Sequence, residues 1–307
     1  MEQVLLIDTD PGVDDALALL MAYERANVAG LSIAAGNVGL QHTVTNALRL
    51  VELAGADTPV YAGCAEPLVL PAADAAFVHG ADGFGDAGLA PPQRRADSEH
   101  AALALIRLTR ERPQQLTLVA LGPLTNLALA LRLDPTLPQR VPRLVIMGGA
   151  VTGRGNTTVP AEFNIGFDPE AAHVVFSAWP QFELVDWEAT LRHGIDLQRF
   201  EAWLTADDAR ARFYEAISRK IRGFHRERGR PGMVVADALA MAVVLDPDCV
   251  QRAEHRHVAV ELSGGLTRGA TVVDWDGRSG RPANARIVLE VDQARFEALI
   301  RQALGAD

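Results

Sequence analysis

Short apolar runs alternate with amphipathic segments along most of the chain. The apolar runs have strand length and predict buried strands at residues 4–7, 30–35, 116–121, 144–147, 182–185, 258–262 and 287–291. Between them, apolar residues recur with helical spacing. This spacing predicts helices at residues 14–24, 43–53, 169–177, 206–224, 236–245 and 293–304, with one more that follows Gly122-Pro123 and ends at Leu133.

This alternation of strands and helices is typical of an α/β protein. It favours a single domain, residues 1–307, with a mostly parallel, Rossmann-like central sheet flanked by helices. The chain shows no internal repeat and no linker marked by a shift in composition, which favours one domain over two. Residues 65–98 are rich in Ala, Pro, Gly and Asp and predict a long loop, and loops of that length are often functional.

The composition argues against several classes of protein. With 29 basic and 39 acidic side chains the net charge is −10, so the overall field would repel a polyanion and we expect no nucleic-acid partner. Two cysteines, Cys64 and Cys249, do not make a disulfide framework or a cysteine-based zinc site. No apolar run reaches the roughly 18 residues of a membrane span, and the first apolar run begins within a few residues of Met1. We therefore expect a cytoplasmic protein without a membrane partner.

Residues with chemical potential follow four of the predicted strands. Asp10 follows the first of these strands, Asn37 the second, Leu121 the third and Met147 the fourth. In open sheets of this kind, ligands bind beyond the carboxyl ends of the strands. We therefore expect these four residues to lie around one ligand site.

An acidic turn follows the first strand, with the sequence Asp8-Thr9-Asp10-Pro11-Gly12-Val13-Asp14-Asp15. Four carboxylates within eight residues repel one another unless a cation neutralises them. Hard carboxylate oxygens with no Cys or His nearby favour Ca²⁺ or Mg²⁺ over zinc. Consecutive helix positions diverge by about 100°. One of Asp14 and Asp15 can therefore face a metal while the other faces something beside it.

Two other interpretations of this turn are open. The acids could be N-caps and first-turn dipole partners on a solvated loop, which is the usual role of a lone Asp-Asp pair. Alternatively, Asp8-Thr9-Asp10 could supply the aspartyl nucleophile of a phosphatase of the haloacid dehalogenase type. That family has Thr or Val two residues after the second Asp, where this chain has Gly12, so the phosphatase interpretation is the weaker one.

The acidic turn and several later segments resemble the nucleoside hydrolase family, which includes inosine-uridine-preferring and pyrimidine-preferring ribohydrolases. The resemblance is dense over roughly residues 1–175 and extends more thinly through Asp237 and residues 262–274. Ordered segments are a much more specific signal than one acidic string. In chain order they are Asp8-Thr9-Asp10-Pro11-Gly12-Val13-Asp14-Asp15-Ala16, Gly36-Asn37-Val38, Val78-His79-Gly80, Leu121-Gly122-Pro123-Leu124-Thr125-Asn126, Met147-Gly148-Gly149, Ala161-Glu162-Phe163-Asn164 and Asp168-Pro169-Glu170-Ala171-Ala172.

The resemblance implies a nucleoside hydrolase fold and an N-ribosyl hydrolase that converts a ribonucleoside to ribose and free base. Ca²⁺ is the implied cofactor. Its implied ligands are the carboxylates of Asp10, Asp15 and Asp237, with Asp15 using both oxygens, and the backbone carbonyl of Leu121. Asp10 would activate the attacking water. The residues implied to contact the nucleoside are Asp14, Asn37, Met147, Glu162 and Asn164 at the sugar, His79, Phe224 and His225 at the base, and Phe163 beside them.

One position departs from the family pattern. Many members have a histidine immediately before the last metal aspartate, where it protonates the leaving base, and purine-specific members have an aromatic residue there. This chain has Ala236. His79 and His225 are the nearest alternatives for the acid. The departure also keeps open a second hypothesis, a non-catalytic or altered-specificity descendant that binds a nucleoside or ribose.

His225 belongs to a basic segment, residues 219–230, which in relatives is a mobile flap over the base. A solvated helix end is the ordinary explanation for most of its arginines, and the net charge disfavours nucleic-acid binding through them. Because relatives are commonly dimers or tetramers that act in purine or pyrimidine salvage, we expect a homodimer or homotetramer with that role.

Overall fold

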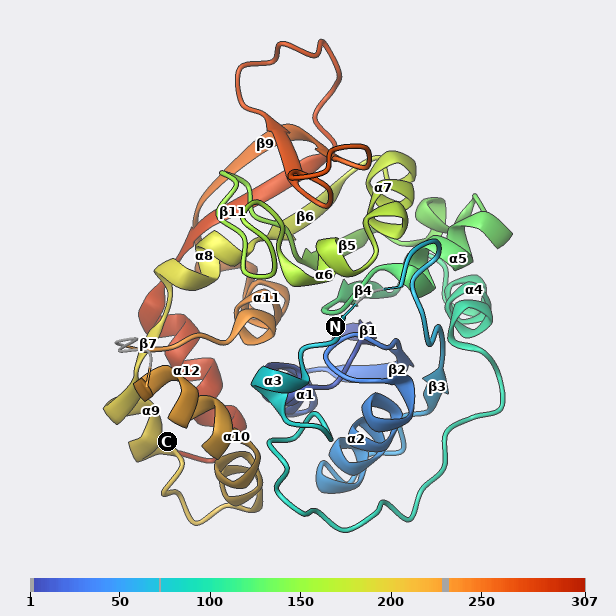
Figure 1. The fold of residues 1–307 in the computed structure, drawn as a ribbon. Coiled ribbons are helices and arrows are strands. Elements are labelled where there is room, and N and C mark those ends of the chain that lie inside the picture. Colours follow the sequence, from blue (N-terminus) through green and yellow to red (C-terminus); the bar gives the residue numbers. More distant parts are fainter. Residues whose placement is uncertain (1–2, 72, 228–231, 307) are drawn as a thin grey trace.

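One mixed sheet forms the centre of the molecule (Figure 1). The structure is a computed structural model that describes residues 3–71, 73–227 and 232–306. Within these residues the sheet has nine strands in the order β10-β9-β11-β6-β5-β4-β1-β2-β3. The strands are β1 (Val4–Thr9), β2 (Asn27–Ile33), β3 (Val60–Ala62), β4 (Thr117–Ala120), β5 (Arg143–Met147), β6 (Phe182–Val185), β9 (Val250–Val260), β10 (Thr271–Asp274) and β11 (Ala285–Val291).

The strand order reverses its direction of winding at β1. This strand pairs in parallel with β2 on one side and with β4 on the other. From β3 to β6 the spatial order 3-2-1-4-5-6 is that of a doubly wound Rossmann sheet. The loops that leave β1 and β4 therefore turn to opposite faces of the sheet, and the space between them is where such folds bind ligands. At the far edge, β9 runs antiparallel to both β11 and β10.

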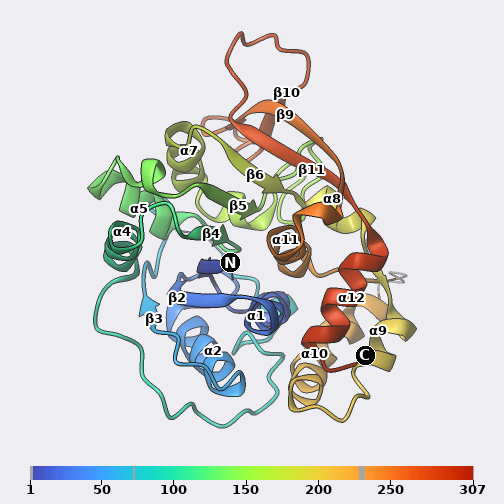
Figure 2. The same cartoon turned by 180° about the vertical axis from the view of Figure 1, so that it is seen from behind.

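Helices cover both faces of the sheet, and each face has its own apolar core. Side chains alternate along β1, so Leu5 and Ile7 enter one core and Leu6 enters the other. Figure 2 shows the two helical layers on opposite sides of the sheet. The first core is closed by α1 (Val13–Arg25), α2 (Leu40–Leu53), α10 (Ala209–Glu227), α11 (Ala236–Leu245) and α12 (Gln293–Ala303), and the second by α4 (Ala101–Glu111), α5 (Thr125–Leu133) and α7 (Pro169–Ala178).

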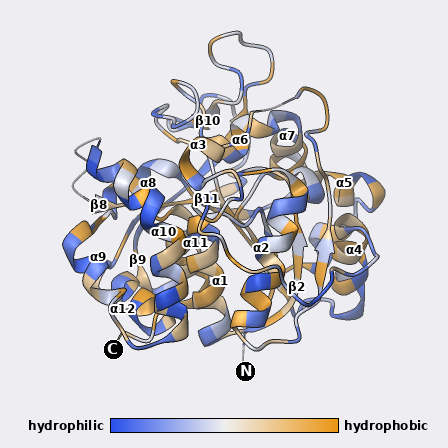
Figure 3. Cartoon of the chain, turned by 60° about the horizontal axis from the view of Figure 1, so that its bottom comes forward, coloured by the Kyte–Doolittle hydropathy of each residue, from blue (hydrophilic) through white to orange (hydrophobic). Residues whose placement is uncertain are grey.

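Helix α11 is the most apolar of the long helices and lies inside the protein. Every residue from Ala236 to Val244 is buried, and α11 packs against both α1 and β5. Its hydrophobic colouring continues into that of α1 (Figure 3). Burial between these elements accounts for its composition. None of the described helices is both long and apolar enough to span a membrane.

The predicted α/β fold with a mostly parallel central sheet is confirmed, and the differences lie where the pattern was weak. Strand β9 begins at Val250, well before the predicted start. The apolar pattern missed its first half because that half is mostly polar and at most partly buried. The apolar pattern did not predict β3, which has only three residues. It also did not predict α4, which begins with alanines like those of the preceding loop. That loop contains one short helix, α3 (Ala76–His79), and then passes around α2 to reach α4 (Figure 1).

Candidate active site

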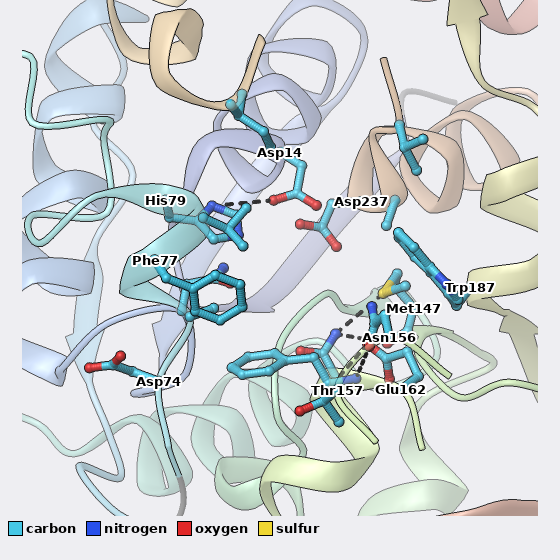
Figure 4. Close-up of a pocket in the computed structure, with 18 of the residues that line it drawn as sticks. Asp14, Asp74, Phe77, His79, Met147, Asn156, Thr157, Glu162, Trp187 and Asp237 are labelled. Atoms are coloured by element: carbon cyan, nitrogen blue, oxygen red, sulfur yellow. Dashed lines mark hydrogen bonds and ion pairs between the residues drawn. The ribbon is translucent and has the colours of Figure 1, made fainter. Parts of the chain in front are cut away.

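A cavity of about 300 Å³ opens where β1, β4 and β5 end, at the reversal of winding. This volume lies at the lower end of the range for small-molecule sites. Figure 4 shows carboxylates from α1 and α11 on one side of the cavity and Glu162 on the other. Asp10 and Asp15 are buried beside it. The remaining residues that the sequence analysis named all line the cavity: Asp14, Asn37, His79, Leu121, Met147, Glu162, Phe163, Asn164, Phe224, His225 and Asp237.

The Asp10 carboxylate is enclosed by backbone on two sides. Its Oδ2 accepts a hydrogen bond from the Asn37 amide at 2.7 Å, and its Oδ1 is buried with no partner within the described residues. A Cβ at Gly36 would lie 2.1 Å from Oδ2, and one at Gly122 would lie 2.3 Å from Oδ1. Only glycine fits at either position. Burial and the negative charge of Asp15 raise the pKa of Asp10 well above its ordinary value.

Asp15 is oriented by the acidic turn itself. Its Oδ1 accepts hydrogen bonds from the Thr9 hydroxyl and the Asp10 amide, and its Oδ2 accepts from the Gly12 amide and the Asn37 side chain, the latter two at 2.9 Å. A carboxylate has about four lone-pair sites. The tight turn before α1 thus directs its own donors at this side chain and holds it in one orientation.

Three carboxylates meet at the floor of the cavity. One oxygen each from Asp14, Asp15 and Asp237 lies within 4.8 Å of the others. Burial raises the pKa of Asp14 to about 6. Burial, followed by the charges of Asp15 and Asp14, holds the pKa of Asp237 well above its ordinary value. A bound cation would relieve the repulsion that these shifts express.

The oxygens around this cluster fit a hard cation. Carboxylate and carbonyl oxygens are the ligands that Ca²⁺ and Mg²⁺ prefer, and Oδ1 of Asp10 is a buried oxygen still without a partner in the described chain. The Leu121 carbonyl accepts a hydrogen bond from Asn164 at 2.7 Å and has a second lone pair. Asp14, which the resemblance implies at the sugar, contributes one oxygen to this cluster of three. Asp10 is not one of the three, but its charge also contributes to the raised pKa of Asp237.

Glu162 and Asn164 form the facing wall of the cavity. Glu162 is the N-cap of α6 (Phe163–Phe167), and its carboxylate accepts hydrogen bonds from the backbone amides of Asn164, Ile165 and Gly149 at 2.8–3.2 Å. Burial raises the pKa of Glu162 to about 7. The Asn164 side chain donates to the carbonyl of Met147 at 3.3 Å as well as to the carbonyl after β4. These bonds tie α6 to the ends of β4 and β5.

The two candidate histidines differ in their hydrogen bonds. His79 accepts the Val13 amide on Nδ1 at 3.1 Å, which places its own proton on Nε2. Burial lowers the pKa of His79 to about 4, so it is neutral at pH 7. His225 Nδ1 lies 2.9 Å from the carbonyl of Gly232 in β8 (Gly232–Met233). A carbonyl only accepts, so Nδ1 of His225 carries a proton and Nε2 is the nitrogen that gains or loses charge.

Several cavity residues escaped the sequence analysis. Phe77 on α3 lines the cavity although it is 69% exposed. Trp187 begins α8 (Trp187–Arg192) directly after β6 and the buried Asp186. The rule that led to Asp10 would also have found Trp187, because it too follows the carboxyl end of a parallel strand. The other missed residues are Asp74, Asn156, Thr157, Ile221 and Val234.

The basic segment of α10 is paired within the protein. Arg222 contacts Glu201 on α9 (Leu197–Trp203) at 2.8 Å and Glu215 at 3.1 Å, and Arg226 pairs with the same Glu201. Residues 228–230 of the predicted flap lie outside the described residues. These ion pairs join α10 to α9, which gives the arginines a role other than contact with nucleic acid.

Proteins of known family match the chain over almost its whole length. The family model described as inosine-uridine preferring nucleoside hydrolase matches residues 5–298. The non-specific ribonucleoside hydrolase RihC of Salmonella enteritidis PT4 is 36% identical over 305 residues, which cover 97% of this chain and 96% of that protein. The match favours a ribonucleoside hydrolase over the phosphatase alternative.

Solved structures agree with this assignment. An inosine-guanosine nucleoside hydrolase superposes with a TM-score of 0.93 at 34% identity over 100% of both chains. A purine-preferring ribonucleoside hydrolase from Gardnerella vaginalis superposes with a TM-score of 0.90 at 28% identity over 98% of both chains. The fold as a whole thus agrees with that of solved nucleoside hydrolases. The chain therefore belongs to the inosine-uridine preferring nucleoside hydrolase family.

Proposed function

We propose that this protein is a ribonucleoside N-glycohydrolase that uses water to break the bond between C1′ of ribose and the base. The observation that carries the proposal is that Asp14 and Asp237, which meet the buried Asp15, face Glu162 and Asn164 across one cavity. The three aspartates suit a cation that also binds the 2′ and 3′ hydroxyls of ribose. Glu162 and Asn164 suit the remaining polar atoms of the sugar. Membership of the family supports the same reaction.

The residues that would hold Ca²⁺ are Asp10, Asp15 and Asp237, with the carbonyl of Leu121. Once bound, Ca²⁺ would neutralise these carboxylates and lower the pKa of a water molecule in the cavity. The side chain of Asp14 is 20% exposed and faces the cavity. It is therefore available to accept hydrogen bonds from the ribose hydroxyls.

Asp10 is the general base of the proposed reaction. Its Oδ1 is buried without a partner within the described residues, and the Asn37 amide fixes the carboxylate through Oδ2. Oδ1 takes a proton from water, and the water oxygen forms a bond to C1′ as the C1′–N bond breaks. The electron pair of the broken bond goes to the base nitrogen, and the base leaves after it gains a proton.

The cavity also suits the transition state. Positive charge develops on the ribose ring as the C1′–N bond lengthens, and the carboxylates of Asp14 and Asp237 border that space. Negative groups that are held in place before the reaction stabilise such charge most strongly where water is excluded. Glu162 and Asn164, fixed by their bonds to the backbone, would hold the sugar from the other side.

Protonation of the leaving base falls to His225 in this proposal. His79 is neutral at pH 7 because burial lowers its pKa to about 4, so it can donate a hydrogen bond but carries no positive charge. As an imidazolium, His225 would donate Nδ1–H to the Gly232 carbonyl and carry its second proton on Nε2, from which the proton would pass to the leaving base. Relatives range from non-specific to purine-preferring, so the family does not determine the base.

Release of ribose from inosine, uridine, cytidine and adenosine tests the proposal. We expect turnover of at least one of them, loss of activity in EDTA, and recovery on addition of Ca²⁺. We also expect 2′-deoxy analogues to react about 10⁴-fold more slowly, because a missing hydroxyl leaves buried carboxylates unpaired. Full activity in EDTA, or equal rates on deoxyribonucleosides, would overturn it. Tight binding of a ribose analogue with no turnover would favour the binding-only descendant that Ala236 suggests.

A further inference from the structure

A second cavity of about 170 Å³ adjoins the first. The two cavities share Ala73, Thr157 and Phe163 as lining residues, so they lie on either side of a common wall. Beyond that wall the lining comes from the long loop, from α6, from the start of α7 and from Arg268. It includes Leu70 from the loop and Phe167 from α6, whose ring stands 5.7 Å from that of Phe163.

Most residues that line the second cavity are apolar, although polar atoms contribute about as much of its surface as apolar atoms do. Its charged lining residues, Arg268 and Glu170, form an ion pair at 2.6 Å, and Arg268 also donates to the Leu262 carbonyl. With its guanidinium engaged in this way, the cavity lacks a cation ready for a phosphate. Leu70 is 51% exposed, which is a high fraction for an apolar side chain that borders a cavity. A hydrophobic group in this cavity would cover it.

The position of the second cavity relative to the sugar follows from the proposed function, on which this inference rests. Hydroxyls O2′ and O3′ face Asp14 and Asp237, and the base lies toward Phe224 and His225 of α10. In a ribonucleoside, C5′ is bonded to C4′, the neighbour of C3′, and lies on the same face of the ring as the base. With O2′ and O3′ at the carboxylates, the proposed binding mode places C5′ toward the opposite wall, where Phe163 lines both cavities.

We propose that the second cavity is a subsite for an apolar substituent on the 5′ carbon of the nucleoside. The substrate class includes ribonucleosides in which a short thioether or alkyl chain replaces the 5′ hydroxyl. The reaction is the same hydrolysis at C1′, and the 5′ substituent takes no part in it. The tail binds Leu70, Phe163 and Phe167, and the polar end of the sugar stays in the first cavity.

A homologous series of substrates measures this directly. The probes are 5′-deoxy, 5′-methylthio-, 5′-ethylthio- and 5′-propylthio-5′-deoxy ribonucleosides of whichever base the protein hydrolyses fastest, followed by release of free base. Each methylene that leaves water should raise kcat/KM about three- to fourfold until the cavity is full. Further lengthening should then reduce kcat/KM, because the tail no longer fits.

Two variants locate the subsite. Leu70→Trp adds bulk at the cavity and should abolish the gain with tail length, while Phe167→Leu enlarges the cavity and should move the optimum to a longer tail. Neither residue lines the first cavity, so unsubstituted nucleosides should react within about twofold of the wild-type rate. Leu266→Trp, at a site 91% exposed and outside both cavities, is the matched control. Thermal unfolding shows whether each variant is folded.

The outcomes separate this inference from the function beneath it. A protein that hydrolyses no ribonucleoside contradicts the proposed function. A protein that hydrolyses ribonucleosides but rejects the thioethers, or shows no gain with tail length, contradicts only the subsite. A gain that neither Leu70→Trp nor Phe167→Leu alters would contradict the placement of the tail.

Discussion

Replacement of Asp237 by asparagine should stabilise the protein in EDTA while removing its activity. The Asp237 carboxylate lies within 4.8 Å of oxygens of Asp14 and Asp15; Asp15 and Asp237 are buried, and Asp14 is partly exposed. Asparagine has nearly the same shape but no charge. Its amide can donate a hydrogen bond to a neighbouring carboxylate, so a repulsive contact becomes an attractive one.

The magnitude follows from the distance. Two like charges 4.8 Å apart repel by about 3 kcal/mol at an effective dielectric constant of about 20. Protonation relieves part of this, because burial and the neighbouring charges already raise the pKa of Asp237. We therefore expect Asp237→Asn to raise the free energy of unfolding in EDTA by about 1–3 kcal/mol, or the Tm by about 2 °C per kcal/mol.

Urea and thermal unfolding at pH 7.5, in EDTA and then in Ca²⁺, provide the assay. The wild type should gain about 2.7 kcal/mol when Ca²⁺ is present at 100 times its Kd. The variant, which lacks one of the ligand oxygens, should gain much less. Asp207→Asn removes the same charge at a fully exposed position and should change stability by no more than about 0.5 kcal/mol in either condition.

Either of two results would refute this reasoning. If Asp237→Asn lowers stability in EDTA by 1 kcal/mol or more, then these carboxylates do not repel one another in the cation-free protein. If the variant gains as much stability from Ca²⁺ as the wild type, then Asp237 is not among the groups that hold the ion.

Three further predictions concern the reaction and its pH dependence. At Ca²⁺ concentrations that saturate the variant, Asp10→Asn should lower kcat by about 10²–10⁴-fold with little change in the affinity for ribose, measured by steady-state kinetics and calorimetry. A change confined to KM would contradict a general base. His225→Gln should lower kcat by a similar factor on natural nucleosides but hardly at all on 4-nitrophenyl riboside, whose leaving group departs without a proton. Equal losses of kcat on both substrates would exclude the acid role of His225. Burial raises the pKa of Asp8 and of Glu162 to about 7, so both bind protons on folding and that stabilisation is lost as pH rises through 7. The free energy of unfolding in EDTA should therefore fall from pH 6.5 to pH 8, by about 1 kcal/mol per pH unit near pH 7, and urea titrations showing a constant or rising value would contradict this.

Sequence patterns predicted the part of the site that lies close to strand ends. Buried parallel strands appear as short, continuous apolar runs, so the ends of β1, β2, β4 and β5 could be located to within a few residues. The residues just beyond those ends, including Asp10 and Leu121, were placed correctly around one cavity region. The rule succeeded because parallel strands bring their carboxyl ends to one edge of the sheet. The same rule applied to β6 would have included Trp187.

Other features depended on contacts between segments far apart in the chain. The approach of Asp14 and Asp15 to Asp237 exists because α1 packs against α11. Burial lowers the pKa of His79, and the bond from the Val13 amide at the start of α1 places its proton on Nε2. The local sequence around His79 carries neither fact.

By itself, the sequence determined the α/β class and the acidic turn that orients Asp15, because these depend on local periodicity and on donors only a few residues away. Its ordered motifs indicated the family through their resemblance to known members. The tertiary structure decided which carboxylates meet, that Nδ1 of His225 bonds to the Gly232 carbonyl, and that a second cavity lies beyond Phe163. The physical reason is that charge repulsion, desolvation and cavity shape depend on distances between side chains. Those distances are set by how helices pack on the sheet, which no local pattern encodes.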